Sequence, residues 1–189
     1  MIISLTGFMG CGKSSVGREL SKLLCCPFMD LDAAIEETEG RSIPEIFATD
    51  GEAAFRAMEV ETLRDIISPD HSHTAECHPE RSEGSADLVL ALGGGTVMTP
   101  RCAELVHENT LCIYLRASVQ TLVSHLGNEA AGRPLLEASD LQERILMLMS
   151  QRSATYEKTA HIIIDTDGKS IEAIASEIIS LLGGKNHTL

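Results

Sequence analysis

A glycine-rich stretch near the N-terminus has the composition of a phosphate-binding loop. Residues 7–14 read GFMGCGKS, which fits the pattern GxxxxGK[ST], and they follow the apolar run 1–5. Glycines let backbone N–H groups curl around phosphate oxygens, Lys13 can bridge the β- and γ-phosphates, and the Ser14 hydroxyl can ligate Mg²⁺. An ordinary glycine turn before a helix is the alternative. The position between a strand and a helix favours a nucleoside triphosphate with magnesium.

Two carboxylates follow in FMDLDAAIE, residues 28–36, where Asp30 and Asp32 are two positions apart. At the end of a strand this spacing points both side chains to one side. One carboxylate can then reach a magnesium shell while the other reaches a substrate hydroxyl. Acidic residues at a helix start can also simply interact with the helix dipole.

Two arginines are candidates for binding an anion. Arg56 lies three residues before Glu59, so both share a helix face and Glu59 can hold the guanidinium. Arg152 continues the apolar stripe Leu141, Ile145 and Leu148 at i+4, and an arginine that points inward needs an anion. Each could be a structural salt bridge, but the pair favours a bidentate clamp on a carboxylate.

Two further segments are suited to contact a ligand. LGGGTV, residues 92–97, follows an apolar strand, and its three glycines let a ligand touch backbone amides, whereas a tight turn needs only one. NEAAGRPLLE, residues 128–137, has the composition of a lid. Its Arg133, fixed by Pro134, could bring a cation onto the phosphates and expel water on closure.

The elements that position these residues alternate between strand and helix. Short apolar runs at 1–5, 88–92, 111–115 and 161–165 indicate strands covered on both faces, and a shorter strand is expected at 27–30. Amphipathic helices are expected from Lys13 onward, along the stripe that leads to Arg152, and after the N-cap Ser170. The sequence therefore predicts an α/β fold with a parallel sheet and right-handed crossovers.

Composition limits the remaining possibilities. The chain has 189 residues, 43% of them hydrophobic, and a formal charge of −13, which predicts one domain that repels nucleic acid and anionic membranes. Six cysteines without a CxxC pair indicate reduced thiols of a cytosolic protein, and no signal peptide or membrane span is apparent. The polar insertion 68–87 is expected to be disordered, its histidines match no regular zinc spacing, and the tail 183–189 is expected to fray.

Several nucleotide-binding classes are disfavoured. No NKxD-like guanine-binding motif follows the strand at 111–115, which disfavours a GTPase. No DGFPR-type segment for a second nucleotide is present, which disfavours an adenylate-kinase-like enzyme.

With these residues in view, the chain resembles the shikimate kinase family over nearly all its length. The resemblance rests on six segments in the family's order and spacing: GFMGCGKSSVGREL, FMDLDAAIE, GRSIPEIFATDGEAAFRAME, LGGGTV, GRPLL and QRSATYEKTA.

The resemblance implies a fold and a reaction. The fold would be a three-layer P-loop kinase domain over residues 1–182, with a five-stranded parallel sheet of order 2-3-1-4-5, helices on both faces and a mobile lid. The reaction would be ATP-dependent phosphorylation of the shikimate 3-hydroxyl in chorismate biosynthesis. A monomer is expected for a separate reason, because the sequence leaves over no obvious apolar stripe for an interface. ATP would be held by Gly10, Cys11, Gly12, Lys13, Ser14 and Ser15.

The remaining roles are implied in the same way. Mg²⁺ would be bound by Ser14 and, through water, Asp30, and Asp32 would accept a hydrogen bond from the reacting hydroxyl and could act as its base. The shikimate carboxylate would be clamped by Arg56 and Arg152, and its hydroxyls would meet Gly93, Gly94 and Gly95. Arg133 would join Lys13 at the phosphates, and Lys169 stands where the family has an adenine-side contact.

Two departures and two rivals remain. The insertion is longer than the family's usual connection, and Ser124-His125-Leu126 stands where members often carry an arginine that packs on adenine.

A gluconate-type kinase is the first rival. It shares the phosphate loop and a substrate with a carboxylate, although the segments GGG and RSIPEIF favour shikimate. A degenerate member that only binds nucleotide, as a scaffold, is disfavoured by the intact Lys13, Asp32, Arg56, Arg133 and Arg152.

Overall fold

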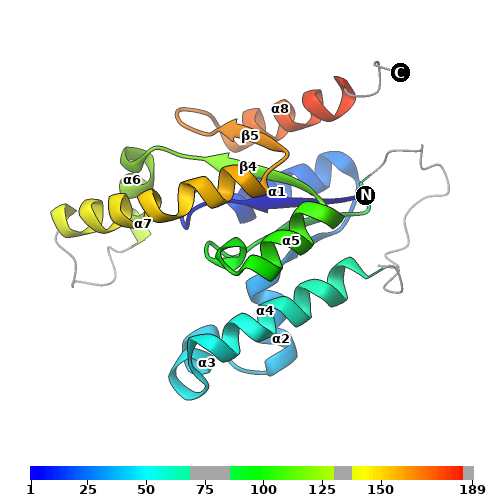
Figure 1. Cartoon of the computed structure of the whole chain (residues 1–189). Coiled ribbons are helices and arrows are strands. Elements are labelled where there is room, and N and C mark those ends of the chain that lie inside the picture. The colour runs from blue at the N-terminus through cyan, green and yellow to red at the C-terminus, as the bar shows by residue number, and fades with distance from the viewer. Residues whose placement is uncertain (69–85, 130–137, 185–189) are drawn as a thin grey trace.

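The computed structural model describes residues 1–68, 86–129 and 138–184 (Figure 1). Most of the insertion predicted at 68–87 and most of the tail predicted at 183–189 lie outside these ranges. The segment with Arg133 also lies outside them. Within the described ranges, no helix has both the length and the apolar composition needed to cross a membrane.

Five parallel strands form one sheet in the order β2-β3-β1-β4-β5, which confirms the expected topology. The central strand β1 pairs with β3 through Ile3 and Val89, and with β4 through Ile3 and Leu111. The strand bounds agree with the apolar runs of the sequence to within one residue. They are β1 (Ile2–Thr6), β2 (Phe28–Asp30), β3 (Leu88–Ala91), β4 (Leu111–Arg116) and β5 (Ile162–Asp165).

Helices cover both faces of this sheet. One buried cluster joins Ile3 and Leu5 to α1, α6 and α8, and a second joins Leu88, Leu90 and Tyr114 to α2, α3, α4 and α5. Helix α7 contributes to both clusters. The bounds are α1 (Lys13–Leu24), α2 (Leu31–Glu39), α3 (Ile43–Thr49), α4 (Gly51–Ile67), the 3-10 turn η1 (Thr96–Met98), α5 (Pro100–Asn109), α6 (Val119–Glu129), α7 (Ala138–Thr159) and α8 (Ile171–Gly184).

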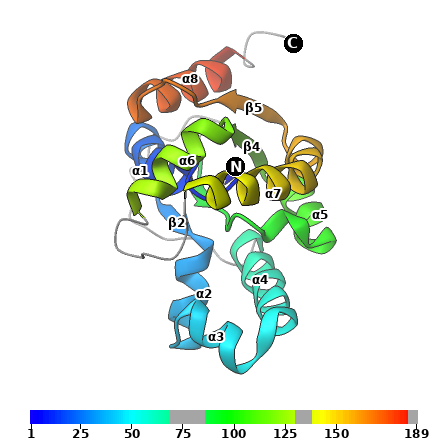
Figure 2. The same cartoon turned by 90° about the vertical axis from the view of Figure 1, so that its left-hand side faces the viewer.

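Helices α2, α3 and α4 form a projecting arm, far from α8 in both views (Figures 1 and 2). Its short middle helix begins with a capping box between Ser42 and Glu45 and carries a proline in its first turn. The arm starts directly at the end of β2, because Asp30 ends the strand and caps α2. The arm therefore places the beginning of α2 at the end of a strand of the sheet.

The connections that leave β1, β2 and β3 lie at one edge, because the carboxyl ends of parallel strands meet there. The loop 7–12 follows β1, the first turn of α2 follows β2, and the glycines 93–95 follow β3. Segments that are up to about ninety positions apart in sequence are thereby brought to one place.

Candidate active site

The loop between β1 and α1 has a backbone that only glycine adopts easily. Gly7, Gly10 and Gly12 have φ angles of 144°, 80° and 93°. A Cβ on Gly7 would lie 2.6 Å from the carbonyl oxygen of Leu115. The Lys13 amine donates to the carbonyl oxygens of Gly7 and Phe8, at 3.0 Å each, so the lysine arches over the loop that precedes it.

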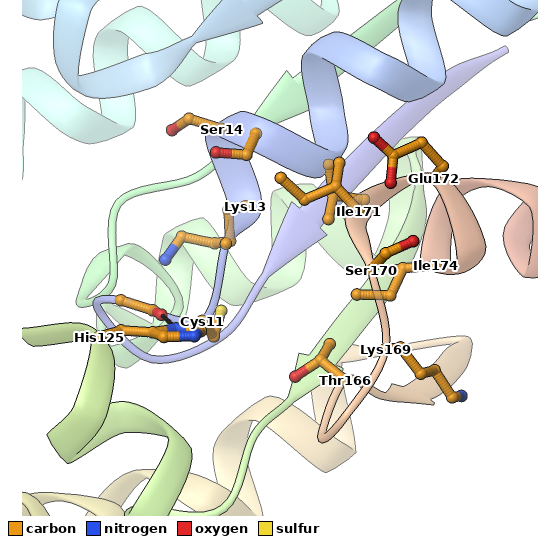
Figure 3. Close-up of a pocket in the computed structure, with 14 residues that line it drawn as sticks. Cys11, Lys13, Ser14, His125, Thr166, Lys169, Ser170, Ile171, Glu172 and Ile174 are labelled. Atoms are coloured by element: carbon orange, nitrogen blue, oxygen red, sulfur yellow. Dashed lines mark hydrogen bonds between the residues drawn. The ribbon is translucent and has the colours of Figure 1, made fainter.

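Two pockets are lined by this loop, and the first lies between the loop and the beginning of α8. It has a volume of about 620 Å³, within the range usual for small-molecule sites. Its walls are the loop with the first turn of α1, His125 of α6, and the connection from β5 into α8 (Figure 3). All the predicted ATP positions from Gly10 to Ser15 line it, and so does Lys169.

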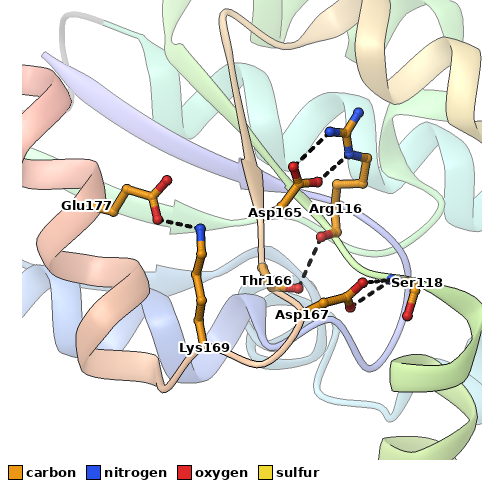
Figure 4. A network of polar contacts seen from close by, with 7 residues as sticks. All are labelled: Arg116, Ser118, Asp165, Thr166, Asp167, Lys169 and Glu177. Carbon is orange, nitrogen blue, oxygen red and sulfur yellow. Dashed lines mark hydrogen bonds and ion pairs between the residues drawn. The ribbon is translucent and has the colours of Figure 1, made fainter.

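Lys169 lines this pocket without directing its charge at the loop. Its amine lies 2.6 Å from a carboxylate oxygen of Glu177, and the two residues form an ion pair (Figure 4). The adenine-side contact implied for Lys169 stays a prediction, and it would use the stem or backbone of this residue while the ion pair persists.

The second pocket, of about 340 Å³, lies on the other side of the loop. It brings together the residues that the sequence analysis assigned to an acceptor. Gly10, Lys13 and Ser14 line both pockets and form a common wall between them. Its remaining lining residues are Met9, Asp30, Asp32, Arg56, Leu92, Gly93, Gly94, Gly95 and Arg152.

Asp30 contacts both the phosphate loop and the first turn of α2. Its Oδ2 accepts a hydrogen bond from the Ser14 hydroxyl at 2.7 Å, and its Oδ1 accepts one from the Asp32 backbone N–H at 3.2 Å. Asp30 is thus both the N-cap of α2 and the partner of the phosphate-loop serine. The two oxygen atoms that could hold a hard cation lie side by side.

Asp32 stands in an environment that disfavours its charge. Burial raises the pKa of its carboxyl to about 6, and the negative charges of Asp30 and Glu59 add to the effect, while Lys13 opposes it. A carboxyl with a pKa near neutrality can change protonation state during a reaction at physiological pH. Asp32 is therefore equipped to accept a proton in this pocket.

Arg56 is held by a carboxylate that is itself buried. Its guanidinium donates to Glu59 at 2.6 Å, and the Glu59 side chain is only 1% exposed. The other oxygen of Glu59 accepts a hydrogen bond from Thr96 of η1 at 2.6 Å. The pairing of Arg56 with Glu59 was predicted from their spacing, whereas Thr96 was missed.

Arg152 reaches the second pocket from α7. Its guanidinium lies 3.5 Å from the carbonyl oxygen of Gly94 and 5.9 Å from the centre of the Phe8 ring. Tyr156, one turn further along α7, donates its hydroxyl proton to the same carbonyl. Sequence reasoning missed Tyr156, although it continues the stripe that runs through Ile145, Leu148 and Arg152.

Each glycine of the triple-glycine turn leaves room for a different neighbour. A Cβ on Gly93 would lie 2.6 Å from Asp32 Oδ1, one on Gly94 would lie 3.2 Å from the Met9 backbone nitrogen, and one on Gly95 would lie 3.0 Å from a terminal nitrogen of Arg56. Contact with a ligand was the role predicted for these glycines. In the structure, Gly93 and Gly95 also admit the side chains of Asp32 and Arg56, and Gly94 admits the backbone of Met9.

His125 and Cys11 clarify the first pocket. The imidazole Nδ1 of His125 lies 2.8 Å from the carbonyl oxygen of Gly10, a contact that the sequence did not reveal. Burial raises the pKa of the Cys11 thiol, which is 3% exposed, so this cysteine fills space and is not an activated nucleophile.

Comparison with known proteins finds relatives of this chain by sequence and by structure. The sequence model of the family described as shikimate kinase matches residues 9–183. A shikimate kinase of Thermus thermophilus is 39% identical over 180 residues, which is 95% of this chain and 89% of that protein. The structure of shikimate kinase from Acinetobacter baumannii in complex with shikimate has a TM-score of 0.82 and 29% identity, over 99% of this chain and 95% of that one.

The gluconate-type rival shares the fold at lower similarity. A gluconokinase from Sinorhizobium meliloti has a TM-score of 0.53 and 17% identity over 97% of this chain and 92% of its own. Such a likeness reports the common architecture alone. Since a family model covers nearly the whole chain and a relative of similar length is well above 30% identical, the protein belongs to the shikimate kinase family.

Proposed function

We propose that this protein transfers the γ-phosphoryl group of ATP to the 3-hydroxyl of shikimate and releases shikimate 3-phosphate and ADP. This reaction is a step in the biosynthesis of aromatic amino acids. Membership of the family supports the reaction, and the pair of pockets supports its assignment to these residues.

One observation carries the proposal: the two pockets share a wall made of Gly10, Lys13 and Ser14. A triphosphate whose terminal group reaches this wall from the first pocket would lie next to a hydroxyl bound in the second. Phosphoryl transfer needs such in-line positioning more than it needs covalent chemistry from the protein.

The second pocket suits a small carboxylic acid that bears hydroxyl groups. Arg56 and Arg152 give it two guanidinium groups, which match a carboxylate in geometry and charge. Asp32 faces the same space and would orient the reacting hydroxyl and take its proton as the O–P bond forms. The glycines 93–95 would let the other hydroxyls approach the backbone.

The donor side would be neutralised by groups of the phosphate loop. Lys13 would exchange its loop carbonyl partners for phosphate oxygens, and the backbone N–H groups at the start of α1 would face the same anion. Ser14 and Asp30 fit Mg²⁺, because a hydroxyl and a carboxylate oxygen lie within 2.7 Å of each other at this wall. Ser14 and Asp30 would hold the ion, which would supply positive charge beside the phosphates when bound.

Two further assignments rest on the sequence. Arg133 would reach the phosphates when the segment around it closes, but it lies outside the described residues. We also propose that the protein acts as a cytoplasmic monomer that binds neither nucleic acid nor membranes. The strongly negative net charge supports this last point.

The proposal is tested by measuring ADP release from ATP and Mg²⁺ with shikimate or gluconate as the acceptor. We expect turnover with shikimate and none above background with gluconate. Turnover with gluconate and none with shikimate would show that the protein is a gluconate-type kinase. Binding of ATP in calorimetry without turnover on either acid would favour the scaffold interpretation.

A further inference from the structure

Two residues of helix α6 contact Gly10 of the phosphate loop. The imidazole Nδ1 of His125 lies 2.8 Å from the Gly10 carbonyl oxygen. The next residue, Leu126, packs against the bare Cα of Gly10, because a Cβ there would lie 3.0 Å from the leucine side chain. Two neighbouring residues of α6 therefore hold the same glycine, one by a hydrogen bond and one by packing.

The hydrogen bond defines the role of the ring nitrogen. A carbonyl oxygen can only accept, so Nδ1 must carry the proton and donate. Both the neutral form protonated at Nδ1 and the imidazolium cation can do so, so the contact does not depend on the charge of the ring. The opposite nitrogen, Nε2, takes no part in it.

The contact fixes a peptide unit that the sequence leaves unusually free. The carbonyl of Gly10 and the N–H of Cys11 belong to one rigid plane. His125 binds the oxygen of this plane, and the carbonyl of Phe8 accepts from its N–H at 3.2 Å. Without such partners, a peptide between Gly10 and the Cys11-Gly12 step could rotate at little cost, because glycine tolerates many backbone conformations.

Helix α6 is itself held at its other end by the connection that completes the nucleotide pocket. The carboxylate of Asp167 accepts from the Ser118 backbone N–H with both oxygens, at 2.9 and 3.2 Å (Figure 4). The Ser118 hydroxyl in turn accepts from the Thr121 N–H at 3.3 Å. The helix therefore spans the distance between the connection 166–170 and the phosphate loop, and both lie on the wall of the first pocket (Figure 3).

We propose that His125 is a positioning residue, which uses Nδ1 to lock the Gly10–Cys11 peptide in the conformation that binds the nucleotide phosphates. Its effect on the nucleotide is exerted through the loop. This inference rests on the proposed function only for its kinetic arm, because binding of ADP can be measured whatever the acceptor is. Preorganisation of the loop should appear as tighter nucleotide binding.

Two amide substitutions distinguish the roles of the two ring nitrogens of His125. In His125→Asn, the amide nitrogen takes nearly the place of Nδ1, whereas in His125→Gln it takes nearly the place of Nε2. His125→Ala removes both. Ser124→Ala, at an exposed neighbouring position of α6 that does not line the pocket, is the matched control.

We expect His125→Ala and His125→Gln to weaken ADP binding in calorimetry and to raise the KM for ATP by about two- to tenfold, the factor that corresponds to one neutral hydrogen bond. His125→Asn and Ser124→Ala should stay within about twofold of the wild type. The KM for shikimate should change less than the KM for ATP, because Asp32, Arg56 and Arg152 are untouched.

Four results would overturn the proposal: wild-type nucleotide affinity in His125→Ala, rescue by Gln in place of Asn, loss of affinity in both amide variants, or a loss in Ser124→Ala equal to that in His125→Ala. All variants are compared well below their melting temperatures, and the Asn–Gln comparison holds the size of the perturbation nearly constant. A wild type that binds ADP but does not phosphorylate shikimate would remove the proposed function and leave the binding comparison intact.

Discussion

At the scale of single residues, Asp32 combines a functional role with a cost in stability. Its pKa is raised from 3.8 to about 6, so the carboxyl contributes stability that is fully present below about pH 4 and is lost as the pH rises through 6. At pH 8 the ionised Asp32 carboxyl lowers the free energy of unfolding by on the order of 3 kcal/mol. This figure treats burial and the neighbouring charges as one effect.

Replacing Asp32 with Asn should therefore make the protein more stable and much less active. We expect a higher melting temperature at pH 8, a smaller gain at pH 4.5, and turnover reduced by about a hundredfold or more, because no carboxylate remains to take the hydroxyl proton. Thermal unfolding at the two pH values and ADP release measure this. A lower melting temperature at pH 8 would show that the Asp32 charge is stabilised in the folded protein.

The pH dependence of catalysis should report the same carboxyl. In the free enzyme, kcat/KM for shikimate should fall below about pH 6, since the protonated form of Asp32 cannot accept the hydroxyl proton. Arginines keep their charge in this range and should not contribute. A profile that stays level down to pH 5 would assign proton transfer to another group.

Arg56 pairs with two glutamates that differ in exposure, and this difference predicts that their substitution will affect shikimate binding to different degrees. The Glu59 side chain is 1% exposed and that of Glu52 is 69% exposed. Glu59→Gln keeps an acceptor for Thr96 but turns an amide donor toward the Arg56 guanidinium, so we expect the KM for shikimate to rise by about tenfold or more. Glu52→Gln, the exposed control, should change it by about twofold at most.

A second readout distinguishes an electrostatic effect of Glu59 from a purely structural one. The charge of Glu59 is among the causes that raise the pKa of Asp32. Its neutralisation should therefore move the acid limb of the kcat/KM profile to lower pH, whereas Glu52→Gln should leave that limb in place. An unchanged limb in Glu59→Gln would contradict the coupling between these two carboxylates.

At the scale of elements, the sequence predicted the sheet well because its strands are short apolar runs covered on both faces. The phosphate loop, Asp32 and the pairing of Arg56 with Glu59 could also be predicted, since each depends on local spacing. Helix α3 was not delimited because seven residues are too few for a period to be recognised. Helix α6 was not delimited either, although Val119, Leu122, Val123 and Leu126 form a recognisable stripe.

Contacts between distant elements could not be read from the sequence. His125 meets Gly10 across 115 positions, and Tyr156 meets Gly94 across 62. A histidine bound to a backbone carbonyl leaves no pattern of residue types, because the acceptor is present at every position. Such contacts depend on how the helices lie on the sheet.

The triple-glycine turn gives a prediction at this scale. In Gly95→Ala, the added Cβ would lie 3.0 Å from the end of the Arg56 side chain, which can move aside. We expect a melting temperature close to that of the wild type and a KM for shikimate raised by about tenfold, roughly the value of one charge-assisted hydrogen bond. Steady-state kinetics and thermal unfolding measure the two effects.

Gly183→Ala is the control for that substitution, because a Cβ there would meet nothing within 4 Å. Its kinetics should equal those of the wild type, and its helix should gain slightly in stability. If Gly95→Ala had wild-type kinetics as well, the close approach of Arg56 to this turn would have no functional weight.

At the scale of the whole molecule, the described residues already contain two buried cores, the sheet between them and the proposed acceptor groups. Residues 69–85 contribute none of the groups assigned to the reaction. Deletion of residues 72–85 should therefore leave kcat and both KM values within about twofold of the wild type, since loop length affects stability only slowly. Loss of nucleotide or shikimate affinity in a folded deletion variant would assign this segment a part in the site.

The common wall of Gly10, Lys13 and Ser14 also has a consequence for inhibition. A single compound that joined an adenine nucleotide to a shikimate-like acid would cross this wall and occupy both pockets at once. Binding of one half would hold the other at a high effective concentration, so its affinity could exceed that of either half by orders of magnitude. The linker between the two halves would have to pass these three residues, because they line both pockets.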